Sequence, residues 1–338
     1  MSSSLLDTGS PRETGRSPGV LALDDATAAA VDTVARALLP VADGEVDAPG
    51  WSAAARRLWH ELPTALRRAL ADFRRDPGPG GALLLRGLPV HEAGVPATPS
   101  VSGSVQRRAT LPASVLALVA HALGDQIAYR SEKSGALVHD VVPVPGSEEF
   151  QGNEGSVLLT FHNENAFDPH RPDYVLLFCL RADHERVAGL RTASIRQVRG
   201  LLDERHREAL FRADFVTAPP PSFGAGRGRS LRHAVLSGAW DDPDLLVDFA
   251  ATSAVTPRGT EAMRALQELF AAHADTHLLV PGDLAIVDNR LTVHGRTAFV
   301  PRYDGLDRWL QRAFVARDLR ASRARRAGDG QVLADLTP

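Results

Sequence analysis

Two residues of this chain that could bind a metal together are His162 and Glu164, which a single residue separates. They follow an apolar run, 156–161, that has the length of a strand. Side chains at positions i and i+2 of a strand share one face, so this spacing brings an imidazole and a carboxylate to the same point. Two imidazoles and one carboxylate on one side of a metal are typical of non-haem iron(II) sites, which leave other positions open for substrate and oxygen. We therefore predict an iron(II) site that includes His162 and Glu164.

The backbone context of the motif carries this prediction, because the motif alone is weak. With 12 histidines and 41 acidic residues among 338, chance gives 12 × 41/338, or about 1.5, His-x-Asp/Glu motifs, and this chain has three. The other two, His206–Glu208 and His273–Asp275, lie in helical patterns. In a helix, positions i and i+2 are about 200° apart around the axis, so neither pair can bind one ion together.

The second imidazole is expected from His294, and the sequence downstream of it supports this choice. His294 follows the apolar run 284–287, and we expect it on a strand facing the first one, so that the ligands meet from opposite sheets. Arg308 and Arg312 share one face of the strand-like segment 308–316, because strands have a period of two. Two arginines inside a barrel are costly unless carboxylates pair with them. The alternatives are a solvated histidine and an edge strand with both arginines in water.

Short apolar runs recur from residue 126 onward, and Pro, Gly, Asn or Asp mark most of their ends. This pattern of short strands bounded by turn residues is typical of a β-sandwich or β-barrel. The predicted strands are 136–142, 156–161, 174–180, 232–236, 245–249, 277–280, 284–287 and 309–315. Helices are predicted at 194–211 and 257–274, the second with Thr256 as its cap and Pro257 in its first turn.

The first 123 residues are predicted to be mainly helical. Residues 1–19 are rich in Ser, Gly, Pro and charge and are predicted to form a disordered tail. Helices are expected at 24–39, 51–75 and 111–123, the last one amphipathic, with a short strand at 82–85. The predicted fold is α+β, with a double-stranded β-helix (jelly-roll) core and flanking helices in one domain, 20–320, before a C-terminal tail, 321–338.

The segment 218–230, APPPSFGAGRGRS, lies between two predicted strands and has three prolines and three glycines. A plain surface loop is one interpretation. The other is a lid that closes over a site, because long irregular loops in compact domains are often functional.

Composition excludes several classes of protein. An apolar content of 44% suffices for a large core, and a formal net charge of −3 gives no sign of a nucleic-acid partner. No apolar stretch approaches the roughly 20 residues of a membrane span, and no signal-peptide core is evident, so we expect no membrane and a cytoplasmic location. The single cysteine, Cys179, excludes a disulfide framework and a thiolate zinc cluster.

Three separated segments, in this order, resemble the clavaminate synthase-like group of iron(II)/2-oxoglutarate oxygenases. They are FHNENAFDPHRPDYVLLFCLR (161–181), VDNRLTVHGR (287–296) and DRWLQR (307–312). The resemblance covers roughly residues 115–320 and is nearest to the asparagine and arginine 3-hydroxylases of nonribosomal-peptide pathways. The gap of 14 between His294 and Arg308 matches the group's spacing between the distal histidine and the co-substrate arginine.

The resemblance implies a role for each of five residues around the metal. His162, Glu164 and His294 would bind Fe(II). Arg308 would bind the distal carboxylate of the co-substrate 2-oxoglutarate, and Thr192 would assist it. The reaction implied is hydroxylation of a free polar L-amino acid at C3 by molecular oxygen.

Further residues match the positions that bind the amino acid in this group. Arg312 would bind the α-carboxylate, Glu132 the α-ammonium group and Asn153 a further polar part of the substrate. Asp248 falls where the side-chain amide or guanidinium is recognised, and 218–230 matches the mobile lid. Each has a plain alternative, since adjacent charges such as Glu132 and Lys133 are often only a solvated pair.

One departure from the group's pattern bears on the substrate. The arginine hydroxylases bind the guanidinium with two acidic residues at i and i+2, whereas here Ala250 follows Asp248. This weakens the case for arginine and leaves asparagine or another polar amino acid. Glu164 favours hydroxylation, because related halogenases have a small residue in its place.

Other activities are compatible with the same residues. The same fold could direct oxidation to desaturation or ring closure, or act on an amino acid attached to a carrier protein. A carrier thioester would, however, remove the carboxylate that Arg312 is expected to bind. A barrel that binds carboxylates or metal without catalysis is the alternative outside enzymes.

Overall fold

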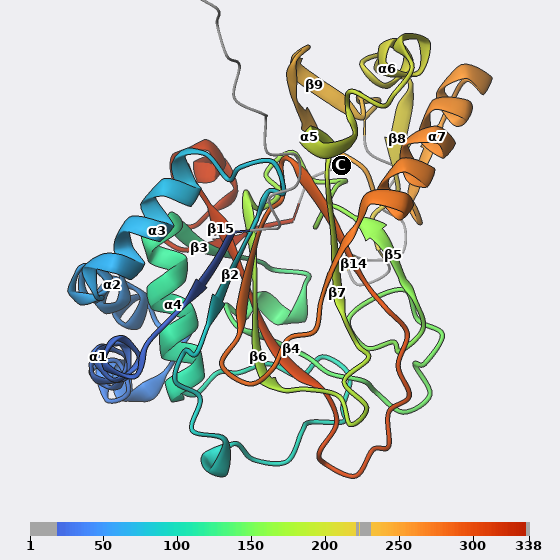
Figure 1. Cartoon of the computed structure of the whole chain (residues 1–338). Helices are drawn as coiled ribbons and strands as arrows, with labels where there is room; N and C mark the ends of the chain where they lie inside the picture. The colour runs from blue at the N-terminus through green and yellow to red at the C-terminus, as the bar shows by residue number, and fades with distance from the viewer. Residues whose placement is uncertain (1–18, 221–222, 224–230, 336–338) are drawn as a thin grey trace, which may run out of the picture.

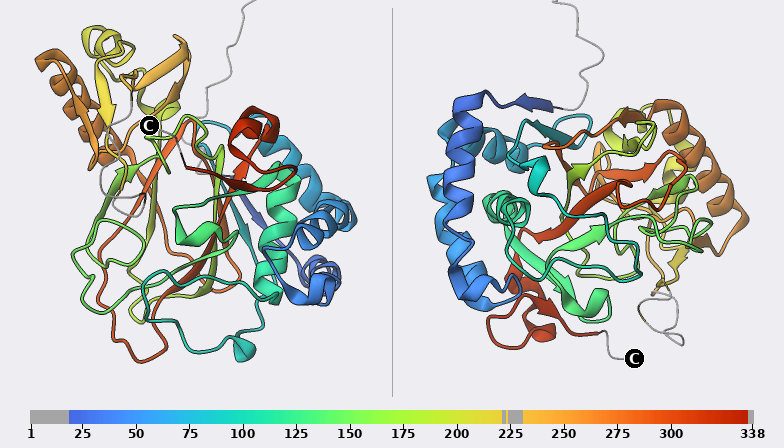
Figure 2. Two further views of the ribbon diagram at one scale, coloured as in Figure 1. Left: turned by 180° about the vertical axis from the view of Figure 1, so that it is seen from behind. Right: turned by 90° about the horizontal axis from the view of Figure 1, so that it is seen from below.

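The computed structural model of the chain describes residues 19–220, 223 and 231–335, and its core consists of two facing β-sheets (Figure 1). One sheet has eight strands and the other has four. Helices cover the outer faces of both sheets, as the view from behind also shows (Figure 2). The predicted jelly-roll core with flanking helices is therefore confirmed.

The large sheet has the strand order β1-β2-β13-β6-β15-β3-β16, with β4 pairing with β15 beside this path. Its strands are β1 (Gly19–Ala22), β2 (Ala82–Arg86), β3 (Asp125–Tyr129), β4 (His139–Val141), β6 (Tyr174–Arg181), β13 (Leu284–Asp288), β15 (Trp309–Ala316) and β16 (Val332–Leu333). The strands predicted at 82–85, 174–180, 284–287 and 309–315 are found within one residue at each end. The segment β3 was not predicted.

Four helices form a layer on the outer face of this sheet. They are α1 (Asp25–Arg36), α2 (Pro49–Leu58), α3 (Thr64–Arg75) and α4 (Leu111–Leu123). The Asp24 side chain caps α1 by accepting from the Thr27 N–H at 2.8 Å. The expectation that 111–123 is amphipathic is wrong, because every residue of α4 is buried. This helix lies between β15, β6 and β3 on one side and α1, α2 and α3 on the other, so both of its faces are apolar.

The single helix predicted over 51–75 is also wrong, since it is broken into α2, a 3-10 turn (Trp59–Glu61) and α3. Pro63 causes the break, because proline lacks a backbone N–H and disfavours helical angles in the preceding residue. Leu62 accordingly has a ψ of 150°.

The small sheet has the order β12-β7-β14-β5 and positions most of the predicted metal ligands. Its strands are β5 (Leu159–His162), β7 (Leu190–Ser194), β12 (Asp275–His277) and β14 (Thr292–Arg296). On its outer side lie α5 (Ile195–Val198), α6 (Glu204–Leu210) and α7 (Pro257–His273). Two further antiparallel strand pairs lie there, β8 (Phe215–Thr217) with β11 (Thr252–Ala254) and β9 (Leu236–Ala239) with β10 (Asp242–Leu245). Helix α7 has the predicted Thr256 cap, whereas the helix predicted at 194–211 is divided between α5 and α6. The strands predicted at 232–236 and 245–249 are shifted, because β9 begins at Leu236 and β10 ends at Leu245.

Strand β15 separates two apolar clusters by strict alternation of its side chains. Trp309, Ala313 and Val315 belong to the cluster under α1–α4. Leu310 and Phe314 belong to the cluster between the sheets. Arg312 lies between these two in sequence and so faces the interior of the jelly roll, as predicted from the period of two.

The remaining described segments complete the domain. Short 3-10 helices cover Val41–Gly44, Glu92–Gly94, Lys133–Gly135 and Leu319–Arg325. The segment 321–338, predicted as a tail, contributes β16, which pairs with β3 through its described residues. Of the predicted tail 1–19, only Gly19 is described, and most of the predicted lid, 221–222 and 224–230, lies outside the described residues. Among the helices of the described ranges, none has the length and apolarity that a bilayer crossing requires.

Candidate metal and substrate site

The two histidines lie opposite each other on neighbouring strands. His162 ends β5, and it pairs in antiparallel register with His294 of β14. Residues directly opposite each other point to the same face of a sheet, and the two ring centroids are 4.4 Å apart. The prediction that the ligands meet from opposite sheets is therefore wrong for this pair. Gly295 permits the approach, because a Cβ there would lie 2.5 Å from the carbonyl oxygen of Leu159.

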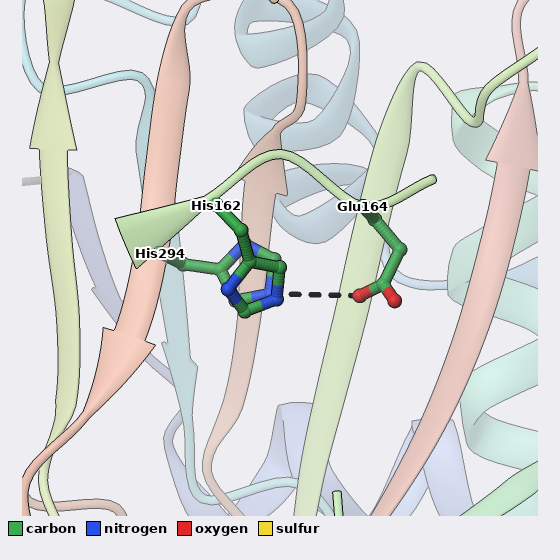
Figure 3. Close-up of side chains that lie close together, drawn as sticks. All are labelled: His162, Glu164 and His294. Atoms are coloured by element: carbon green, nitrogen blue, oxygen red, sulfur yellow. Dashed lines mark ion pairs between the residues drawn. The ribbon is translucent and has the colours of Figure 1, made fainter. Parts of the chain in front are cut away.

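Glu164 lies two residues beyond the end of β5, and its carboxylate points back toward the imidazoles (Figure 3). Its Oε2 is 3.6 Å from His294 Nε2. The Asn289 side chain fixes the backbone here, since it accepts from the Glu164 N–H at 2.8 Å and donates to the Glu164 carbonyl at 3.0 Å. Asn163 adds to this clamp by donating to the Asn289 and Thr292 carbonyls, both at 3.0 Å. The turn after β5 thus brings Glu164 to the place that the i, i+2 spacing predicted.

The three side chains fit a metal ion. Their ligand atoms all lie within 4.8 Å of one another. His162 Nδ1 is 2.9 Å from the Thr160 carbonyl, to which it donates, so the Nε2 lone pair is available. The Oε2 atom of Glu164 is buried and has no hydrogen-bond partner among the described residues. A buried carboxylate oxygen without a donor is costly, and a cation bound by the two imidazoles and this oxygen would satisfy it.

The charges around the site favour the protonation states that metal ligands require. Burial would raise the pKa of the Glu164 carboxyl, but Arg312, His294 and His162 outweigh it and hold this pKa well below its usual range. Burial, followed by the neighbouring His162, lowers the pKa of His294. The carboxylate is then ionised and the imidazole neutral at neutral pH, as metal binding demands.

Arg312 links the metal site to a second carboxylate. It is 2% exposed, and its guanidinium donates to Glu164 at 2.7 Å and to Glu132. Asn153 accepts from both terminal nitrogens of Arg312, at 3.0 and 3.1 Å, in the amide orientation that satisfies both of its polar atoms. Burial opposes the charge, but Glu164 and then Glu132 raise the pKa of Arg312. The predicted substrate residues Arg312, Glu132 and Asn153 therefore form one cluster beside Glu164.

Arg308 lies in the interior of the jelly roll. It is 6% exposed, and no described residue forms a hydrogen bond or ion pair with its guanidinium. A second buried guanidinium, that of Arg296, lies near the same aromatic ring, Phe299, at 5.1 Å against 6.0 Å for Arg308. Thr192, on β7, is directly opposite His294 and is 1% exposed. This part of the interior offers positive charge, and no carboxylate of the described residues forms an ion pair with either guanidinium.

A cavity of about 150 Å³ opens beside the cluster. Six of the predicted site residues line it, namely Glu132, Asn153, His162, Glu164, Asp248 and Arg312. Arg308, Thr192 and His294 are not part of its wall. Pro220 and Phe223, the described residues of the predicted lid that reach this place, also line it. A small polar molecule held there would contact Arg312 and Glu132 while lying next to the predicted metal ligands.

Asp248 is at the wall of this cavity and forms a backbone bridge with His162. Its Oδ1 accepts from the N–H groups of Ala250 and Ala251, at 2.8 and 3.2 Å. One carboxylate oxygen therefore closes the local turn. No described residue forms a hydrogen bond with Oδ2, so this oxygen could accept from a ligand.

Sequence reasoning missed three residues that shape the site. Asn289 clamps Glu164, His139 contacts Arg312 at 2.9 Å, and Arg296 shares the interior with Arg308. Arg296 could have been found, because the period of two places it on the same face as His294. Asn289 and His139 gave no such signal, since their partners are distant in sequence.

Comparison with known proteins agrees with this geometry. Residues 61–314 match the family model described as taurine catabolism dioxygenase TauD, TfdA family. The L-asparagine oxygenase of Streptomyces coelicolor is 59% identical over 92% of this chain and 93% of its own length. Clavaminate synthase 2 of Streptomyces clavuligerus is 36% identical over 84% and 89%. A crystal structure of asparagine oxygenase with Fe(II), 2S,3S-3-hydroxyasparagine and succinate is 58% identical and superposes with a TM-score of 0.91, covering 93% of this chain and 99% of that one.

Proposed function

The chain belongs to the taurine catabolism dioxygenase TauD, TfdA family, and we propose that it hydroxylates free L-asparagine at C3. It is an Fe(II)/2-oxoglutarate-dependent dioxygenase that acts on a polar amino acid, as the predicted resemblance implied. The observation that carries the choice of substrate is the cluster of Arg312, Glu132 and Asn153 beside Glu164. It offers a cation, an anion and an amide next to the metal ligands, in a cavity of about 150 Å³.

In this proposal, three side chains hold the cofactor and two hold the co-substrate. His162, Glu164 and His294 bind Fe(II), which together with 2-oxoglutarate supplies the oxygen activation that an unactivated C–H bond requires. The unpaired guanidinium of Arg308 binds the distal carboxylate of 2-oxoglutarate, with Thr192 beside it. Since Arg308 has no partner among the described residues, a bidentate carboxylate would compensate a charge that burial disfavours.

The amino acid is oriented by opposite charges at its two ends. Arg312 donates to the α-carboxylate and Glu132 accepts from the α-ammonium group, while Asn153 makes a further polar contact. These groups lie at fixed positions in the fold and so reduce the entropy lost on reaching the reactive geometry. A carrier-bound thioester would leave Arg312 without its carboxylate, which is why the proposed substrate is the free acid.

Asparagine fits the far end of the cavity better than arginine does. Asp248 has one oxygen free for a ligand donor, and one carboxylate oxygen suits the N–H of a side-chain amide. A guanidinium has five donors and is usually bound by more than one acceptor. The neighbouring Ala250, which also lines the cavity, supplies none.

The test is incubation with Fe(II), 2-oxoglutarate, oxygen and each free amino acid in turn, including citrulline and ornithine. The expected result is one added oxygen on asparagine for each succinate formed, with NMR placing the hydroxyl group at C3. Preferred oxidation of another amino acid would refute the substrate. Loss of two hydrogens instead of a gain of oxygen would identify desaturation or ring closure, and the absence of any coupled succinate would favour a barrel that only binds.

We also propose that the protein acts in the cytoplasm. Its one cysteine, Cys179, is buried and unpaired, so the fold needs no oxidising compartment. Fractionation of the producing cells, with activity recovered in the cytosolic fraction, tests this location.

A further inference from the structure

A buried histidine, which the proposed mechanism does not use, lies against the proposed substrate arginine. His139 belongs to β4, and its backbone is directly opposite Arg312 of β15. Both side chains therefore point to the same face of the large sheet. His139 is 2% exposed, and its Nδ1 lies 2.9 Å from Arg312 Nη2.

The second ring nitrogen of His139 determines which tautomer is present. Its Nε2 is 2.9 Å from the carbonyl oxygen of Ala136, and a carbonyl can only accept. Nε2 therefore carries the proton and donates to Ala136. Since a guanidinium can only donate, Nδ1 must be the unprotonated nitrogen that accepts from Arg312. Burial, followed by Arg312 and Lys133, lowers the pKa of His139 and keeps the ring neutral in agreement with this assignment.

The other partners of Arg312 belong to the ligands in the proposed mechanism. Glu164 is a proposed metal ligand, Glu132 is the proposed partner of the substrate ammonium group, and Asn153 lines the cavity. When metal and substrate are bound, these three groups are engaged elsewhere. Of the four acceptors of Arg312, His139 is the one that binds no ligand in this mechanism. Its Nε2 stays hydrogen-bonded to the Ala136 carbonyl, so its Nδ1 remains directed at Arg312.

Phe314 packs against both Arg312 and His139. It lies on the same face of β15, its ring is 4.5 Å from the Arg312 guanidinium carbon, and its centroid is 5.5 Å from that of His139 in an edge-to-face contact. The imidazole and the guanidinium thus rest on one aromatic ring, which limits rotation of both. The position of Arg312 is set before any ligand arrives.

We infer that His139 is a positioning residue, which holds the guanidinium of Arg312 in the orientation that receives the α-carboxylate of the amino acid. The inference rests on the proposed role of Arg312. It assigns to His139 a share of substrate affinity, without contact between His139 and the substrate.

Two substitutions separate this role from simple filling of the core. In His139→Asn, the side-chain oxygen falls near the place of Nδ1 and can still accept from Arg312. In His139→Gln, the longer amide falls near the place of Nε2 and can still donate to Ala136. If His139 acts through Arg312, the asparagine variant keeps substrate affinity and the glutamine variant loses it. If His139 only anchors β4, the order of the two variants is reversed.

The measurement is anaerobic calorimetric titration of L-asparagine into each protein with Fe(II) and 2-oxoglutarate bound. The expected result is a Kd close to that of the original protein for His139→Asn and a Kd roughly 10- to 100-fold higher for His139→Gln, the effect of one hydrogen bond to a charged group. L-Asparaginamide, which has no α-carboxylate, should bind the three proteins equally. Equal effects of both variants on asparagine, or an equal penalty with the amide ligand, would overturn the inference.

The affinity for 2-oxoglutarate checks that each variant is folded, since no hydrogen bond, ion pair or ring contact among the described residues joins His139 to Arg308. Loss of 2-oxoglutarate binding in both variants would show that His139 holds the fold together, and would also overturn the inference. If the unaltered protein binds another amino acid in place of asparagine, the proposed substrate fails. The same comparison with that amino acid then decides the role of His139, because the α-carboxylate is common to all of them.

Discussion

Replacing Arg308 by methionine should stabilise the protein and at the same time remove its co-substrate binding. Arg308 is 6% exposed, and no described residue forms a hydrogen bond or ion pair with its guanidinium. Burial lowers its pKa, which means that the charged form is disfavoured where it lies. Leaving a buried polar group unsatisfied costs roughly 1–3 kcal/mol. Methionine has a similar length and no charge. The Arg308 nitrogens keep a little contact with solvent, so the free energy of unfolding without 2-oxoglutarate should rise by up to about that amount.

The loss of binding in Arg308→Met should be much larger than this gain. A bidentate guanidinium–carboxylate contact consists of two hydrogen bonds between charged groups, each contributing roughly 1.5–3 kcal/mol. The Kd for 2-oxoglutarate should therefore rise by about two to four orders of magnitude. Arg308→Lys is the matched control, because it keeps the charge and gives up the bidentate geometry.

The assay is chemical denaturation of Arg308→Met, Arg308→Lys and the unaltered protein, anaerobically with Fe(II), with and without 2-oxoglutarate. At 100 times its Kd, the ligand should stabilise the unaltered protein by about 2.7 kcal/mol and the methionine variant hardly at all. Adding the ligand should therefore shift the difference in free energy of unfolding between these two proteins by more than about 2 kcal/mol in favour of the unaltered protein. A methionine variant that is less stable without 2-oxoglutarate and gains as much from it as the unaltered protein would refute the reasoning.

Three further predictions concern the metal, the substrate side chain and acid stability. Changing His162 and His294 together to Ala should abolish stoichiometric iron binding, measured by metal analysis, and with it succinate formation; retained turnover would reject these ligands. Asp248→Ala should raise the KM for asparagine roughly 10-fold or more through loss of a hydrogen bond, with a smaller change for an amino acid without a side-chain amide; an unchanged KM would remove Asp248 from the substrate site. Burial, followed by Arg56, lowers the pKa of His121 from 6.5 to about 4. The unfolded chain then binds the proton first, so stability present above pH 6.5 is lost as the pH falls toward 4, by roughly 3 kcal/mol in total. His121→Leu should lose that much less unfolding free energy than the unaltered protein over this range, and parallel losses in urea titrations would contradict it.

The sequence was most informative where inward- and outward-facing residues alternated without interruption along a strand. The alternation around Arg312 in β15 was predicted correctly, and so was the convergence of Glu164 with His162. Strand β7 was not predicted, and β14 was expected as the strand that carries His294 but without bounds. The side chains that face the site, such as those of Thr192 and His294, interrupt the apolar runs used to detect strands. Strands whose polar side chains face the site, such as β7 and β14, are therefore harder to identify from hydrophobic patterns than β15.

Local sequence patterns did not predict which distant strands pair with each other, or in what register. The two histidines were expected on opposite sheets, but the register of β5 with β14 places them side by side. That register depends on the bulge near Arg296 and on the close approach at Gly295, which involve residues more than 100 positions apart. The contacts of His139 and Asn289 have the same origin.

One face of strand β15 contacts the helical layer and the other faces the interior that holds the proposed site. Substitutions far from the site can therefore affect it through this strand. Its outward side chains pack on α4, whose residues are all buried, while its inward side chains include Arg312. Protein cores are close-packed and do not absorb a missing methylene without movement. A small change in α4, such as Leu116→Ala, should let β15 shift and so alter the distance between the guanidiniums of Arg308 and Arg312. Substrate preference can therefore be altered from a helix that contributes no side chain to the lining of the cavity.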